Sequence, residues 1–226
     1  MSGFKFNVSA ATEDIRDGGS SSSILRNGVH PVTLKFASVV ETKHKAYQLN
    51  LNVVSGGKDF VLYGPIIQNK DGNPNTIGMR LLHKLSIVAG LAQGQQVSTS
   101  AETHPVGKDQ VMTELQVIPE FSDLDCQIHI QEEYNLYDNR IQENFRIRNV
   151  FNAEGASADE IVRGDSEDFG KQLAVTLEKF VDNTTYSDGL TAEAVQEWKK
   201  AQRAGSNAAA PASAAVTKRT AVFGQR

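Results

Sequence analysis

The chain has a single cysteine, Cys126, among its 226 residues. One thiol cannot form an intrachain disulfide and cannot alone supply a thiolate zinc site. No apolar run reaches the roughly 18 residues that span a bilayer, and Met1 to Val8 lacks the basic-then-apolar layout of a signal peptide. We therefore expect a soluble, cytoplasmic chain without membrane contact, in which Cys126 is a core residue.

Signatures of common enzyme sites are also missing. The sequence has no Gly-x-x-x-x-Gly-Lys-Ser/Thr phosphate loop, no Gly-x-Gly-x-x-Gly and no His-Glu-x-x-His. Asp123 and Asp125, with Glu132 and Glu133, form a set of carboxylates suited to Mg²⁺ in a nuclease. Strand alternation, however, puts Glu132 and Glu133 on opposite faces. We predict no enzyme, no catalytic residue, no metal and no cofactor, with a metal-dependent nuclease as the less favoured alternative.

Positive charge is not in excess, since the formal net charge is −4. This argues against a protein that is basic over its whole surface, as many duplex-binding architectural proteins are. The charges are nevertheless segregated along the chain. Seven Lys and Arg oppose three acidic residues between Gly28 and Ser100, whereas one Lys opposes nine acidic residues between Ala101 and Asn139. The segregation produces either a basic surface on an acidic protein or two solvated faces of opposite sign.

The first half of the chain has the periodicity of strands followed by a helix. Apolar and polar residues alternate over 32–37 and 47–53, and a Gly-Gly turn leads into the apolar run 60–63. Apolar residues then recur at helical spacing over 77–88, and Gly90 ends the pattern. We predict an α+β fold with a predominantly antiparallel β-sheet, OB-like or a variant of it. One amphipathic helix follows the first meander, and further helices form the C-terminal part.

Four segments follow from these patterns. They are an N-terminal strand and flexible loop (1–27), a β-rich core (28–155), C-terminal helices (156–203), and a linker with a basic tail (204–226). Val111 to Phe121 is predicted as a strand of the core that Pro119 interrupts. Ser157 and Glu160 form a capping box for a short helix. A second helix is predicted over 167–181, and Thr191 caps a third that runs through Trp198.

The most informative stretch of the sequence is a predicted hairpin over 126–151. A two-residue turn at Asp138-Asn139 places Tyr137 opposite Arg140 and thereby fixes every later pair. One face then carries the pairs Leu136 with Ile141, Ile130 with Ile147 and Cys126 with Phe151, together with Phe145. The other face carries Asn135 with Gln142, Glu133 with Asn144, Gln131 with Arg146, and His129 with Arg148.

The polar face of this hairpin is rich in planar hydrogen-bonding groups. Arginine both stacks on a nucleic-acid base and forks onto a phosphate. Tyr137 and His129 add π-faces, and stacking of a base on an aromatic ring contributes about 1 to 3 kcal/mol. The pattern indicates single-stranded nucleic acid as the ligand, although an exposed face that happens to be amide-rich is the competing interpretation. Nothing in the sequence reads a 2′-hydroxyl, so DNA and RNA remain equal alternatives at this point.

A resemblance adds to this interpretation. The strand-strand-strand-helix block from Gly28 to Gly90, followed by a long hairpin that ends at 146–151, resembles phage-encoded single-stranded DNA-binding proteins, including those that act as cofactors of a phage RNA polymerase. The resemblance covers roughly 28–155. It implies sequence-tolerant binding of single-stranded DNA in replication, recombination or transcription, inside a bacterial host. It also implies partners such as a phage RNA polymerase or replication protein and a mobile C-terminal tail that contacts them. Such tails are often acidic, whereas this one is basic.

Other basic residues extend the predicted site. They are either phosphate contacts or merely solvated charges, and they comprise Lys43 and Lys45 at a hairpin tip, the helix residues Arg80 and Lys84, and the basic tail. A structural or assembly protein is the second hypothesis, in which the polar face makes subunit contacts and the C-terminal helices hold a homo-oligomer together. The predicted nucleic-acid-binding residues are Arg140, Arg146, Arg148, Gln131, His129 and Tyr137 on the hairpin, Lys43, Lys45, Tyr47 and Lys35 in the meander, Arg80 and Lys84 on the helix, and Lys218 and Arg219 in the tail.

Overall fold

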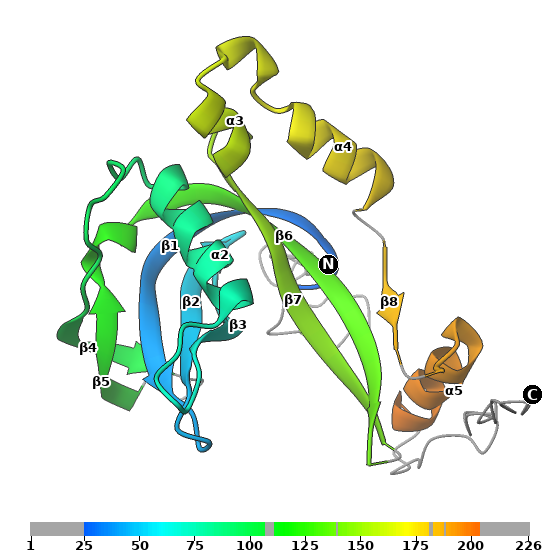
Figure 1. Cartoon of the computed structure of the whole chain (residues 1–226). Coiled ribbons are helices and arrows are strands. Elements are labelled where there is room, and N and C mark those ends of the chain that lie inside the picture. Colours follow the sequence, from blue (N-terminus) through cyan, green and yellow to red (C-terminus); the bar gives the residue numbers. More distant parts are fainter. Residues whose placement is uncertain (1–24, 107–110, 139, 181–182, 188, 204–226) are drawn as a thin grey trace, which may run out of the picture.

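The computed structural model describes residues 25–106, 111–138, 140–180, 183–187 and 189–203. The predicted N-terminal strand, the linker and the basic tail lie outside them. In the described part, the chain has an α+β fold built on an eight-stranded, mostly antiparallel sheet, which confirms the predicted class (Figure 1). The elements are β1 (Gly28–Glu41), β2 (Tyr47–Ser55), β3 (Lys58–Gln68), α2 (Thr76–Val88), β4 (Ser100–Val106), β5 (Val111–Ile118), η1 (Pro119–Phe121), β6 (Leu124–Tyr137), β7 (Arg140–Asn152), α3 (Ala158–Arg163), η2 (Ser166–Asp168), α4 (Lys171–Lys179), β8 (Thr185–Tyr186) and α5 (Ala192–Arg203).

Five strands pair in the order β3-β2-β1-β6-β7 and form an OB-like path. Along the chain, α2 comes after β3 and before β6. The long strand β1 makes this possible because it changes neighbours. It pairs with β2 on one side, and on its other side with β6 near its start and with β5 near its end. The path curls until β3 and β7 approach each other, and α2 packs against both (Figure 1). The β4–β5 hairpin extends the sheet beyond β1.

The core lies inside this curled sheet and under α2. Apolar residues of β1, β2 and β6 are buried there, and α2 adds one apolar side at helical spacing. Burying a side chain of this kind contributes about 1.5 to 3 kcal/mol, so the core supplies most of the gain on folding. Cys126 is buried there, and burial raises the pKa of its thiol to about 12, as expected for a core cysteine. The central core residues include Leu34, Leu49, Leu51, Val53, Leu81, Leu85, Ile118, Ile128 and Ile130.

Helix α2 is held close to β3 by its first turn. The side chain of Asn75 caps the helix by accepting hydrogen bonds from the backbone N–H groups of Ile77 and Gly78. Gly78 is required for the close approach, because a Cβ atom there would lie 2.0 Å from the carbonyl oxygen of Ile66. Gly90, with φ of 74°, then ends the helix. The result is a fixed helix beside the free edge of β3.

The hairpin β6–β7 confirms the predicted register over its distal part. Tyr137 pairs with Arg140, and every later pair holds as far as Ile130 with Ile147. Beyond that point the prediction is wrong, because Arg148 is an extra residue in β7 and forms a β-bulge. His129 therefore pairs with Asn149 instead of Arg148. For the same reason, Cys126 pairs with Asn152 and Phe151 pairs with Gln127.

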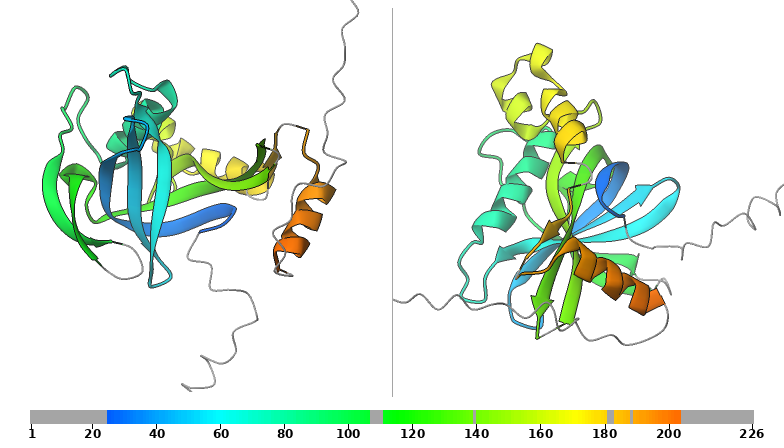
Figure 2. Two further views of the ribbon diagram at one scale, coloured as in Figure 1. Left: turned by 90° about the horizontal axis from the view of Figure 1, so that it is seen from below. Right: turned by 90° about the vertical axis from the view of Figure 1, so that its right-hand side faces the viewer.

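The C-terminal part follows the predicted helices with one shift. The capping box of Ser157 and Glu160 is present at the start of α3, and Thr191 caps α5 by accepting from the N–H of Ala194. The predicted helix over 167–181 begins later, because Gly170 with φ of 84° separates η2 from α4. Figure 2 shows the β6–β7 hairpin reaching away from β1, β2 and β3, with α5 beside its distal end. No helix in the described residues is long and apolar enough to cross a bilayer.

Candidate nucleic-acid interface

A cavity of about 660 Å³ opens between β3, α2 and β7, and we call it the β3–β7 groove. Among the described strands, β3 pairs only with β2 and β7 only with β6, so two free strand edges border it. Its volume is within the roughly 300 to 1,000 Å³ of ordinary ligand pockets. Its lining residues are Gln48, Val61, Leu62, Tyr63, Gly64, Pro65, Ile77, Arg80, Leu81, Lys84, Ile130, Glu143, Asn144, Phe145, Arg146, Ile147 and Arg148.

The groove is basic. Its lining includes Arg80 and Lys84 from α2 and Arg146 and Arg148 from β7, against one carboxylate, Glu143. The fold thus brings together four of the residues predicted as nucleic-acid contacts, from segments far apart in the sequence. Such a strip of guanidinium and ammonium groups suits a phosphate backbone.

Exposed apolar groups lie in the same groove. The ring of Tyr63 on β3 is 68% exposed, and Ile77 on α2 is 65% exposed. Phe145 and Ile147 of β7 line the groove and are partly buried. An exposed aromatic ring beside several cations is the combination that single-strand binders use, since the ring stacks on a base while the cations hold the phosphates.

The two groove arginines of β7 are fixed by neighbours on β6. Arg146 forms a two-point ion pair with Glu133, in which Nη2 donates to Oε1 at 3.1 Å and Nε contacts Oε2. Arg148 donates from Nε to the side-chain oxygen of Gln131, and its Nη2 lies 3.9 Å from Glu133. Gln131 in turn donates to the carbonyl of Asn183 at 2.5 Å. This network sets the direction of both guanidinium groups.

Two of the predicted contact residues are buried in the structure. Gln131 is 7% exposed and His129 is 5% exposed. They lie on the polar face as predicted, but the chain after α4 covers this part of the face through Asn183. Burial lowers the pKa of His129 and outweighs the opposing hydrogen bond to the backbone of Phe180, and the positive charge of Arg148 and the neighbouring His30 lower it further. Gln131 is therefore a positioning residue, and His129 is not available as a stacking surface.

Those of the remaining predicted residues that the structure describes lie outside the groove lining. Tyr137, 69% exposed, and Arg140 form the far tip of the hairpin. Lys43 and Lys45 are exposed on the β1–β2 turn, where Lys45 pairs with Glu41 at 3.0 Å. The other members are Tyr47 at the start of β2, Lys35 on β1, which pairs with Asp59, and Lys218 and Arg219, which are outside the described residues.

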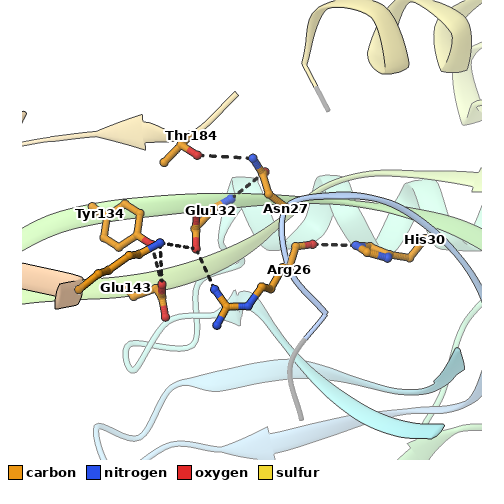
Figure 3. Close-up of polar contacts among 8 residues, drawn as sticks. Arg26, Asn27, His30, Glu132, Tyr134, Glu143 and Thr184 are labelled. Atoms are coloured by element: carbon orange, nitrogen blue, oxygen red, sulfur yellow. Dashed lines mark hydrogen bonds and ion pairs between the residues drawn. The ribbon is translucent and has the colours of Figure 1, made fainter. Parts of the chain in front are cut away.

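The opposite face of the hairpin carries a second polar cluster, shown in Figure 3, whose member Glu143 also lines the groove. Tyr134 donates to Glu143 at 2.5 Å, and Lys199 of α5 lies 3.4 Å from Glu132 and 3.6 Å from Glu143. Arg26 lies 3.7 Å from Glu132. Burial, then the hydrogen bonds to the two carboxylates, raises the pKa of Tyr134. Burial alone would raise the pKa of Glu143, but its hydrogen bonds and Lys199 lower it below the ordinary value.

The carboxylates of the nuclease alternative lie on β6 and directly before it. In the described ranges, no group of three or more His, Cys, Asp or Glu residues is placed to hold a metal ion. Glu132 and Glu133 lie on opposite faces and each has cationic partners of its own.

Comparisons of the chain with protein-family models, curated proteins and solved structures find no match. The groove is therefore the main guide to function. Sequence reasoning missed Tyr63, Ile77 and Phe145 as groove residues. For Tyr63 a signal existed, because alternation through 60–63 points this tyrosine away from buried Leu62. Ile77 and Phe145 had no such signal, since both fit the apolar pattern of core positions.

Proposed function

We propose that this protein binds single-stranded DNA with little sequence preference, and that the strand lies in the β3–β7 groove. The observation that carries the proposal is the meeting of four basic side chains with exposed Tyr63 at one opening of an OB-like sheet. Arg80, Lys84 and the two β7 arginines contact phosphates, and Tyr63 stacks on a base. The protein is a binding module and not an enzyme. The resemblance to phage single-stranded DNA-binding proteins supports roles in replication, recombination or transcription, with a phage polymerase or replication protein as partner.

The direct test removes the β7 cations. Arg146→Ala with Arg148→Ala should weaken binding of a fluorescent single-stranded oligonucleotide at least about tenfold, because two charge-assisted contacts are lost. The slope of log K against log salt should become shallower by about 1.4, at about 0.7 per lost phosphate contact. Arg163→Ala with Lys179→Ala on α3 and α4 removes the same charge elsewhere and serves as the matched control. Equal affinity of the double variant and wild type across the salt series would contradict the proposal.

The same titration against single-stranded RNA and duplex DNA defines the ligand class. Preference for single-stranded DNA supports the proposal, and equal weak affinity for all three reduces the site to general electrostatics. If wild type binds none of them but forms a concentration-dependent oligomer, the assembly hypothesis is favoured. Exposed Val162, Val175, Leu177 and Phe180 on and beside α3 and α4 are the observation behind that alternative.

A second experiment locates the stacking residue by comparing two exposed tyrosines. Tyr63→Ala should weaken binding about tenfold, since stacking on an aromatic ring is worth about 1 to 3 kcal/mol per base. Tyr63→Phe should restore most of the affinity, because the ring is kept. Tyr137→Ala removes an equally exposed ring at the hairpin tip, outside the groove. A larger loss for Tyr137→Ala than for Tyr63→Ala would place the strand along the tip and contradict the groove.

A further inference from the structure

The two arginines that β7 contributes to the groove already have an anionic partner within the protein. Glu133 engages Arg146 at two points, and the second arginine, Arg148, lies at the edge of ion-pair distance, 3.9 Å. The side chain of Glu133 is 16% exposed, whereas those of Arg146 and Arg148 are 49% and 43% exposed. One sheltered carboxylate thus compensates two accessible cations.

Arg146 binds Glu133 with the same geometry with which an arginine binds a phosphate. A guanidinium presents a planar fork that fits two oxygens of either a carboxylate or a phosphate. Glu133 occupies the fork of Arg146 from the neighbouring strand, at a point where Gln131 fixes the position of Arg148. Lys84 of α2 differs in this respect, because its partner within the described residues is neutral: it donates to the side-chain oxygen of Asn149 at 2.8 Å.

Glu132, the residue before Glu133 on β6, provides the contrast. It also has two cationic partners, Arg26 and Lys199, but neither of them lines the groove. Its ion pairs can persist whether or not a ligand is bound. The pairs of Glu133 involve two groove-lining arginines, so a phosphate that approaches the Nε–Nη2 edge of Arg146 meets a carboxylate oxygen already there.

We infer that Glu133 is an internal competitor for the phosphate backbone, which lowers the affinity of the groove and makes binding conditional on exchange of Arg146 from carboxylate to phosphate. The inference rests on the proposed function of the groove. In the free protein the carboxylate holds the arginines in place. On binding, a phosphate displaces it, and the cost of breaking the internal pair is subtracted from the gain of the new contact.

The test is Glu133→Gln, which keeps the shape of the side chain and removes its charge. Affinity for a fluorescent single-stranded DNA oligonucleotide at about 0.1 M NaCl should rise about tenfold. The slope of log K against log salt should become steeper by about 0.7 to 1.4, as one or two further phosphates are neutralised without internal competition. Thermal unfolding followed by circular dichroism checks that the variant is folded.

Two controls isolate the effect. Glu178→Gln makes the same change in net charge on exposed α4 and should leave affinity within about twofold. Glu133→Gln combined with Arg146→Ala and Arg148→Ala should bind no more tightly than the arginine double variant, because the competitor then has nothing to release. A gain that survives loss of both arginines would overturn the inference.

The outcomes separate this inference from the proposal on which it rests. If wild type binds single-stranded DNA and Glu133→Gln binds equally or more weakly, Glu133 only positions the arginines and the inference fails alone. If neither protein binds any single strand, the proposed function fails and the inference falls with it. A further measurement needs no nucleic acid: the rate at which phenylglyoxal modifies Arg146, mapped by mass spectrometry. This rate should be higher in Glu133→Gln than in wild type. Equal rates would overturn the claim that Glu133 occupies this guanidinium.

Discussion

The two faces of the β6–β7 hairpin hold similar side chains in opposite conditions. On one face, which we call the clamped face, Glu132, Tyr134 and Glu143 lie under α5 and are bound by Lys199 and Arg26. On the other, the arginine face, Gln131 and Glu133 hold two arginines that stay nearly half exposed. Adjacent residues of one strand thus serve different purposes, because strand alternation sends them to different surroundings.

The difference shows that polarity alone does not mark a binding surface. The clamped face is as rich in charge as the arginine face, yet its groups satisfy one another, and of Glu132, Tyr134 and Glu143 one residue, Glu143, also lines the groove. The ring of Tyr134 also stacks against that of Tyr186, with 5.9 Å between the ring centroids. It contacts the ring of Trp198 edge-on at a centroid distance of 6.3 Å, and this contact anchors α5 to the hairpin. The cations of the arginine face have one competitor and open onto the groove. A candidate binding site therefore differs from a structural cluster in that its charged groups are accessible and can exchange their partners.

The largest expected effect comes from breaking the clamped face. Tyr134→Ala should lower the free energy of unfolding by about 3 to 5 kcal/mol, because a ring that is only 1% exposed is removed and the contact with Trp198 is lost. Urea denaturation measures the loss, and emission of Trp198, the single tryptophan, reports release of α5. Tyr137→Ala, the same substitution three residues further along β6, should change stability by less than about 0.5 kcal/mol.

That variant also sharpens the comparison between the faces. Tyr134→Ala protein that remains folded at low temperature should bind single-stranded DNA within about threefold of wild type, since Tyr134 does not line the groove. A loss of affinity as large as that of the arginine double variant would mean that the clamped face, and not the arginine face, contacts the strand.

Much of this fold could be predicted because its signals are local. The period of two and the turn at Asp138 set the distal register of the hairpin, and the capping box set the start of α3. The bulge could not be predicted, because Arg148 and Asn149 are both polar and leave no mark in the apolar alternation. Strand β4 was missed for a related reason: it is a half-exposed edge strand that contains Pro105.

The features of the candidate site could likewise be predicted where their causes are local and could not where their causes are distant in the sequence. Its arginines and lysines could be named from residue type and face. Arg80 and Arg146 border one groove because the sheet curls and brings β3 and β7 together. This curling has no local signal in the sequence. The burial of His129 and Gln131 depends on a covering segment some fifty residues later in the chain, as the bond of Gln131 to Asn183 illustrates.

The smallest expected effect is a difference in pH dependence between the faces. On the arginine face, burial lowers the pKa of His129 below its value in the unfolded chain. Its contribution to stability is therefore complete above about pH 6.5 and declines as the pH falls through the lowered value, because the unfolded chain then binds the proton more readily. On the clamped face, the pKa of Glu143 is lowered from 4.5, so its contribution is complete above that pH and is lost only below it.

Acidification should thus loosen the arginine face before the clamped face. Urea denaturation of wild type should show a first decline in stability below about pH 6.5 and a second below about pH 4.5. His129→Gln should remove the first decline and leave the second, because glutamine carries no proton to gain beside Arg148. Release of α5, followed by Trp198 emission, should coincide with the second decline alone. If Trp198 responds already in the first, the two faces are coupled through β6, and the separation between site and clamp does not hold.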